Sequence, residues 1–272
     1  FMPGPMQSGA LRADGGAYVA SQGGLYGNRE SAEIRAVAPD GSVDSTFGFG
    51  GTVKPEWITG GLTVGDMVAR RGGVLAASTR SGGKPVLIQL LADGRPDPAF
   101  GDGGVVRLPF HASAIHVARG GDIVVAGAPG GWYARVVRFS AQGTRRRAFG
   151  VGGTAGWHRG RYGGYPADVA SDGRGRIYVL FADGARPRNG VLAFTRGGRR
   201  VNRFGRRGLA WLPRVRRDLG AYEGNDLVVD RGGLLVVGSH HVDGYYHAAF
   251  GSGDREDISA YETRLRVWRL DR

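Results

Sequence analysis

Apolar residues along this chain come in short runs, and turns rich in glycine separate them. The runs that follow these turns contain small, β-branched and aliphatic residues, and the clearest cover residues 17–20, 74–77, 122–126, 177–180 and 234–237. Short runs bounded by Gly-Gly or Asp-Gly are typical of β-strands joined by tight hairpins. The longest apolar run has about six residues, whereas a membrane-spanning helix needs about 20. The pattern therefore predicts an all-β chain without membrane insertion.

A longer phrase recurs between these strands at a nearly constant spacing. It reads Asp-Gly-x-x-Asp-x-x-Phe-Gly-x-Gly-Gly from Asp40 and again from Asp93, and two altered copies follow. The Phe-Gly pairs begin at residues 47, 100, 149 and 204, with spacings of 53, 49 and 55 residues. Each repeat thus contains a strand, a Gly-Gly hairpin, two further strands, the phrase and a short fourth strand. Four antiparallel strands in each repeat are typical of a β-propeller blade.

The repeats predict one domain over residues 1–272, a single five-bladed β-propeller of four-stranded antiparallel blades. The phenylalanine of each phrase is expected to fill the core between blades. The chain ends where blade five should begin its phrase, so residues 1–7 either complete that blade or leave it with three strands. The expected blades cover residues 8–55, 62–108, 112–156, 165–212 and 223–272.

The phrase resembles the delta-60-type repeat of bacterial β-propellers, which is similar to NHL-type blades. The resemblance is close in the first two copies and weaker at residues 145–147 and 205–208, where the aspartate and the Gly-Gly pair are lost. It implies a secreted or surface-exposed bacterial protein, with an extracellular, periplasmic or cell-surface location. It implies no particular reaction.

Charge and cysteine content narrow the classes of partner and site. The chain has no cysteine, which excludes disulfides, thiolate metal sites and cysteine nucleophiles. Its net charge is +13, and 35 of its 37 basic residues are arginine. This charge would attract acidic polymers in a salt-dependent way, although scattered arginines are more typical of solvated turns. Nothing organises them for specific nucleic-acid binding, and a monomer is expected.

Aromatic residues and histidines gather in the loops that join one blade to the next. Trp and Tyr side chains beside polar groups suit sugar rings and other flat ligands. The alternative is that these aromatic side chains cap the ends of the blades. The expected ligand-binding residues are Trp57, His111, Trp157, His158, Tyr162, Trp211 and Tyr245.

Three aspartates share one repeat position at the start of the innermost strands. Asp66, Asp168 and Asp226 each precede their hairpin turn by six residues, and Gly9 and Ala114 occupy this position in the other blades. Around a central channel they would lie close together, where they could act as acid or base or hold a cation. The alternative is that each accepts hydrogen bonds from free backbone N–H groups.

The longest insertion, residues 239–263, contains half of the six histidines within eight residues. Imidazole and carboxylate groups in such a loop could bind Zn²⁺ or another divalent metal ion, the one cofactor to consider. The alternative is a solvent-exposed polar loop. The candidate ligands are His240, His241, Asp243 and His247.

Two functions remain in competition. The first is a non-catalytic propeller that binds a glycan or protein partner on its aromatic loop face. The second is a propeller hydrolase or lyase at the channel mouth, in which the three aspartates work with His111, His158 or His241, with or without a metal ion. The sequence contains no recognisable catalytic set, which favours the first.

Overall fold

A computed structural model describes residues 6–22, 32–54, 62–80, 84–129, 134–157, 164–183, 188–212, 222–230, 233–249 and 255–270. These residues form strands and turns, and no helix that could span a membrane occurs among them. The expected all-β class is confirmed.

The strands form five antiparallel sheets, A to E, each built from consecutive segments of the chain. Sheet A contains β1 (Met6–Leu11), β2 (Ala17–Gln22), β3 (Ala32–Val37) and β4 (Thr52–Val53). Sheet B contains β5 (Leu62–Arg70), β6 (Gly73–Arg80), β7 (Val86–Leu90) and β8 (Val105–Arg107). Sheet C contains β9 (His111–Val117), β10 (Ile123–Ala128), β11 (Ala134–Phe139) and β12 (Thr154–Trp157). Sheet D contains β13 (Gly164–Ser171), β14 (Ile177–Asp183), β15 (Arg188–Phe194) and β16 (Leu209–Trp211).

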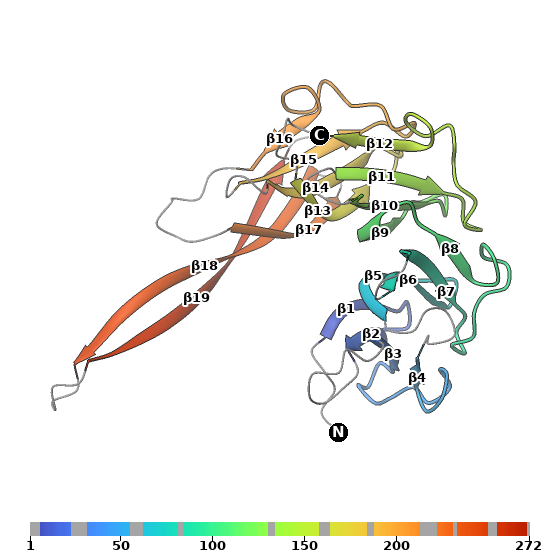
Figure 1. Cartoon of the computed structure of the whole chain (residues 1–272), viewed down its shortest axis with the longest axis horizontal. Coiled ribbons are helices and arrows are strands. Elements are labelled where there is room, and N and C mark those ends of the chain that lie inside the picture. The colour runs from blue at the N-terminus through green and yellow to red at the C-terminus, as the bar shows by residue number, and fades with distance from the viewer. Residues whose placement is uncertain are drawn as a thin grey trace.

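Sheet E contains three strands in the described part of the chain, namely β17 (Tyr222–Asp230), β18 (Gly233–Ala249) and β19 (Arg255–Leu270). Met6 and Gln7 belong to β1 of sheet A, so they do not supply a fourth strand to sheet E. Residues 1–5 lie outside the described part. The first strands of successive sheets contact one another in chain order, and the five sheets follow an arc with A and E at its ends (Figure 1).

The repeated phrase holds neighbouring sheets together. Its four phenylalanines are buried, with at most 4% of their surface exposed, and they pack in the apolar clusters between sheets. In the first three copies of the phrase, the N–H of the glycine that follows the phenylalanine donates to a carbonyl of the next sheet's phrase. The Gly101 N–H, for example, donates to the Gln142 carbonyl at 2.9 Å. Gly101 has φ +56°, and a Cβ there would collide with the Val105 carbonyl. The turn therefore requires glycine.

The described residues of the expected loop, 239–249 and 255–263, are instead the outer parts of two paired strands. Strands β18 and β19 pair continuously from Leu234 with Leu270 to Ala249 with Arg255, and the hairpin projects from the body of the molecule (Figure 1). The prediction of an irregular loop is wrong because the two arms of the insertion satisfy each other's backbone hydrogen bonds.

Candidate functional site

The three aspartates accept backbone N–H groups, and two of them, Asp66 and Asp168, thereby connect adjacent sheets. Each follows a register shift in its first strand, and the bulge leaves nearby N–H groups unpaired. Asp66 accepts Met67 N–H of its own strand at 2.7 Å and Ile115 N–H of sheet C at 2.7 Å. A hydrogen bond from Ser8 of sheet A adds a third sheet to this contact.

Asp168 repeats the arrangement between sheets D and E. It accepts Val169 N–H at 2.6 Å and Leu227 N–H at 2.7 Å, while Asp226 accepts the same Leu227 N–H at 2.8 Å. The alternative role proposed from the sequence, acceptance of free backbone N–H groups, accounts for these contacts. What the sequence did not reveal is that one of the two donors comes from the next sheet.

Burial changes the acidity of this cluster. It raises the pKa of Asp66 to about 6, although the two backbone N–H groups oppose the shift. Burial and the hydrogen bond with Asp226 raise the pKa of Asp168 well above its usual range. In its protonated form Asp168 can donate a hydrogen bond to Asp226.

No group of three or more His, Asp or Glu side chains within the described ranges is placed to hold a metal ion. The four candidate ligands between 240 and 247 lie in β18, whose side chains at these positions are outside the description. Because an extended strand rises about 3.3 Å per residue, His240 and His247 are roughly 23 Å apart. No contact of these four side chains is described, so the metal site stays a prediction.

Two of the expected ligand-binding aromatics come together at one end of the seam between sheets C and D. The rings of Trp157 from β12 and Trp211 from β16 both contact Phe181, with centroids 5.0 and 5.6 Å from its centroid. Both indoles are partly buried against the apolar cluster between these sheets. A Cβ at Gly190 would press on Phe181 and Trp211, so the bare backbone of β15 makes room for the rings.

The other expected ligand-binding residues are not brought to this cluster. His111 is exposed at the first position of β9. Tyr245 lies within β18, and its side chain is outside the description. Trp57, His158 and Tyr162 fall outside the described residues. The structure thus assembles Trp157 and Trp211, and the wider aromatic face stays a prediction.

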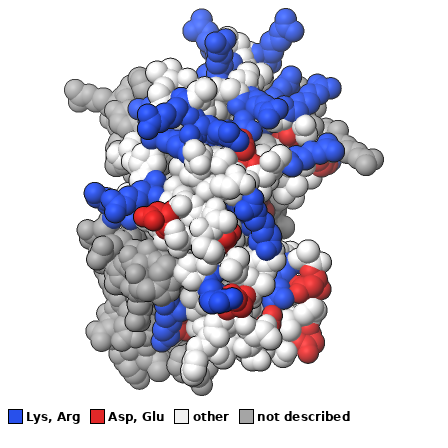
Figure 2. Space-filling view, turned by 90° about the vertical axis from the view of Figure 1, so that its right-hand side faces the viewer, with Lys and Arg blue, Asp and Glu red and all other residues white. Residues whose placement is uncertain are grey.

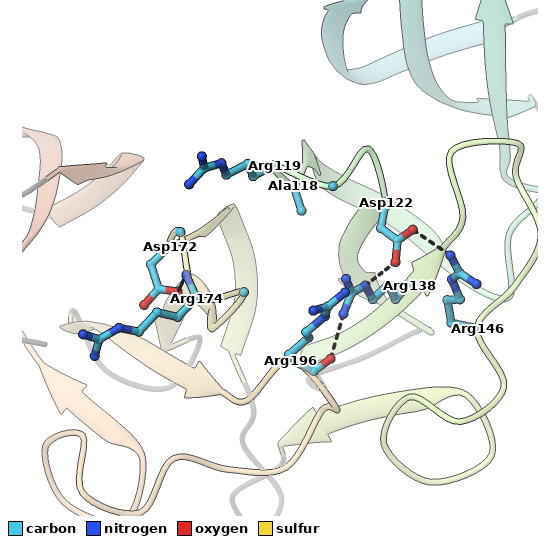
Figure 3. Close-up of a pocket in the computed structure, with 11 residues that line it drawn as sticks. Ala118, Arg119, Asp122, Arg138, Arg146, Asp172, Arg174 and Arg196 are labelled. Atoms are coloured by element: carbon cyan, nitrogen blue, oxygen red, sulfur yellow. Dashed lines mark hydrogen bonds and ion pairs between the residues drawn. The ribbon is translucent and has the colours of Figure 1, made fainter.

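The opposite end of the same seam contains a pocket that sequence reasoning missed. It has a volume of about 500 Å³, and arginines from both sheets surround it (Figure 3). Arg119 and Arg174 come from the first hairpins of sheets C and D, and Arg196 from the turn after β15. The charged lining residues are Arg119, Asp122, Arg138, Arg146, Asp172, Arg174 and Arg196.

One carboxylate organises part of this pocket. Asp122 lies between two arginines, 2.9 Å from Nε of Arg138 and 2.9 Å from Nη2 of Arg146 (Figure 3). Arg138 is 91% buried, and its Nη1 donates to the Arg196 carbonyl at 2.8 Å. Its guanidinium is therefore fixed in the wall of the pocket.

A count of charges by segment could have located this region. Residues 109–212 contain 18 arginines and four aspartates, a net charge of +14, so they account for the whole excess of the chain. In Figure 2 the basic side chains crowd the upper part of the face, over sheets C and D, and are interspersed with acidic ones below.

The likeness of this chain to known proteins lies in its fold. No model of a known protein family matches the sequence, and no curated protein sequence matches it significantly. Hydrazine synthase from Kuenenia stuttgartiensis aligns with a TM-score of 0.51 and 11% identity, over 98% of this chain and 63% of that one. The PQQ-bound aldose sugar dehydrogenase from Streptomyces coelicolor aligns with a TM-score of 0.52 and 14% identity, over 96% of this chain and 80% of that one. The chain is thus similar to β-propeller-like proteins in fold, and spans less than two thirds of the hydrazine synthase chain.

Proposed function

We propose that this chain is a secreted or surface-exposed five-bladed propeller of the delta-60-repeat type that binds a glycan. The ligand would lie on the aromatic cluster formed by Trp157, Phe181 and Trp211. Two indoles on adjacent sheets offer flat apolar faces with polar edges, and these suit the faces of sugar rings. The fold of the repeats and the resemblance of the phrase support this class of protein.

The observation that carries the proposal is the preorganisation of this cluster. Phe181 holds both indoles from the side, and Gly190 leaves the space that the rings need. Rings fixed before a ligand arrives lose little conformational freedom on binding. Each stacking contact would add about 0.5–1.5 kcal/mol beyond area burial, so two contacts give modest affinity.

A second candidate function rests on the carboxyl pair. Asp168 is hydrogen-bonded to Asp226, and a carboxyl group with so strongly raised a pKa is a candidate acid or base. An enzyme at the channel mouth, hydrolase or lyase, would use this pair. Both oxygens of Asp168 already accept backbone N–H groups, which favours the structural role and places this candidate second.

The binding proposal is tested with immobilised oligosaccharides, neutral and acidic, followed by calorimetry on those retained. Trp157→Leu and Trp211→Leu should each weaken binding at least tenfold. Phe194→Leu is the matched control, because Phe194 is a buried member of the same cluster; it should lower the melting temperature and leave affinity unchanged.

The proposal would be overturned if the wild-type protein retained no glycan. It would also be overturned if both tryptophan variants bound a retained glycan as tightly as the wild type does. Turnover of an oligosaccharide that disappears in Asp168→Asn would instead favour the enzyme.

A further inference from the structure

The arginine pocket lies where sheet C lacks an arginine that sheets A and B both have at one hairpin position. By the register of the first two strands, Arg12, Arg70 and Ala118 occupy the same hairpin position in sheets A, B and C. In sheet A, Arg12 Nη1 lies 2.6 Å from Asp44 of the phrase. In sheet B, Arg70 Nη2 donates to the Ala141 carbonyl of sheet C at 2.7 Å.

In sheet C, a different strand supplies the bridging guanidinium. The carbonyl of Arg196 occupies the phrase position of Ala141, and Arg138 of β11 donates to it at 2.8 Å. Position 118 is alanine, so the volume that Arg70 fills between sheets B and C has no equivalent side chain between sheets C and D. Ala118 lines the resulting hollow.

The phrase of sheet C has also exchanged its carboxylate for a cation. The first and second copies of the phrase have Asp44 and Asp97 at one position, and the third copy has Arg146 there. Arg146 turns to Asp122, which Arg138 also contacts. The two changes together remove one acidic partner and enlarge the space in front of the remaining arginines.

The pocket retains an uncompensated positive charge. Its two carboxylates face five arginines. One of them, Asp172, is buried and accepts two backbone N–H groups of its own turn as well as the Tyr178 hydroxyl at 3.2 Å. Three guanidinium groups make no ion pair or hydrogen bond with any described residue, and these belong to Arg119, Arg174 and Arg196.

We propose that this pocket binds a small ligand through an oxyanion group, a phosphate, sulfate or carboxylate. Arg138 gives the site a fixed wall, while Arg119, Arg174 and Arg196 supply donors that can close around the oxygens. A volume of about 500 Å³ accommodates a group of monosaccharide size in addition to the anion. The site is separate from the aromatic cluster, at the other end of the sheets, and does not depend on it.

The experiment is calorimetric titration of the purified protein with inorganic phosphate, sulfate and acetate at near-physiological salt. Binding of one of the three in the millimolar range or tighter is expected, and the order among them distinguishes a tetrahedral oxyanion from a carboxylate. The double variant Arg174→Gln with Arg196→Gln should bind the anion at least tenfold more weakly than the wild type. Arg147→Gln with Arg203→Gln is the control, because it removes the same charge from exposed positions of sheets C and D outside the pocket.

A second variant tests the origin of the pocket. Ala118→Arg with Arg146→Asp restores the residue pair of sheets A and B, which should fill the hollow and abolish binding while the melting temperature is maintained. Failure of the wild-type protein to bind any of the three anions would overturn the proposal. Equal weakening by the control pair would do so too, because attraction would then depend on overall charge alone.

Discussion

Residues 1–108 form sheets A and B, residues 109–212 form sheets C and D, and the two halves share one architecture but differ in charge. The first half contains ten basic and ten acidic residues, whereas the second contains 18 arginines and four aspartates. Both halves bury the same phenylalanine of the phrase and pair their strands in the same order. The fold therefore constrains the core positions and leaves the turn positions open to other demands.

The turns show how the halves differ in detail. In sheet A, Asp44 binds both the N–H and the hydroxyl of Thr46 and pairs with Arg12. The third phrase has no such carboxylate, and Arg145 ties the turn by donating to Thr154 Oγ1 at 2.9 Å. Arg145 thus connects the third phrase to β12 by a contact that differs from that of Asp44, and the phenylalanine of the phrase remains buried.

The largest expected effect tests what the halves share. Phe100→Ala and Phe149→Ala each remove a buried ring from an equivalent position, so each should lower the free energy of unfolding by about 3–5 kcal/mol. Denaturant unfolding of both variants measures this. A loss in one half and not in the other would show that the two cores are not equivalent.

A smaller effect concerns the carboxyl contact between sheets. Because the folded-state pKa of Asp66 is raised to about 6, folding favours its protonated form. Its contribution is present below about pH 4 and is lost as the pH rises through 6, on the order of 2–3 kcal/mol. Asp168 shifts in the same direction and extends the loss to higher pH.

Unfolding free energies of the wild type and of Asp66→Asn, measured from pH 4 to pH 8, isolate this contribution. The wild type should lose more stability than the variant over this range. Parallel curves would contradict the shift. The contribution of Asp44 to stability depends on pH in the opposite direction. The Thr46 hydroxyl and Arg12 lower the pKa of Asp44 to about 2, so its contribution is lost only in more acidic solution.

The smallest effect separates the halves. Asp44→Ala removes the acceptor of a turn N–H, a change comparable with the loss of a helix cap, and should cost about 1 kcal/mol. Arg146→Ala, at the equivalent position of sheet C, removes an exposed side chain paired with Asp122 and should lower stability less than Asp44→Ala does. Thermal melting of both variants compares them, and equal losses would mean that the two turns depend on this position alike.

The sequence located features that depend on local chemistry. Glycines at 101 and 150 mark turns that need positive φ, and the phenylalanines before them are buried. The shared position of Asp66, Asp168 and Asp226 was also visible, because the repeat period aligns residues that the chain separates. The sequence did not show that Asp66 and Asp168 connect neighbouring sheets, because the second N–H donor to each belongs to a neighbouring repeat.

The sequence by itself determined the repeat, the strands and the buried phenylalanine of each phrase, because glycine conformations and apolar runs act within a few residues. Only the tertiary structure decided that residues 239–249 pair with residues 255–265, since pairing depends on which segment lies alongside. It also decided that Ala118, Arg138 and Arg196 meet around one pocket. Those residues come from different strands of two sheets, and the space between them exists only because the sheets pack side by side and one of them lacks the side chain that fills this position elsewhere.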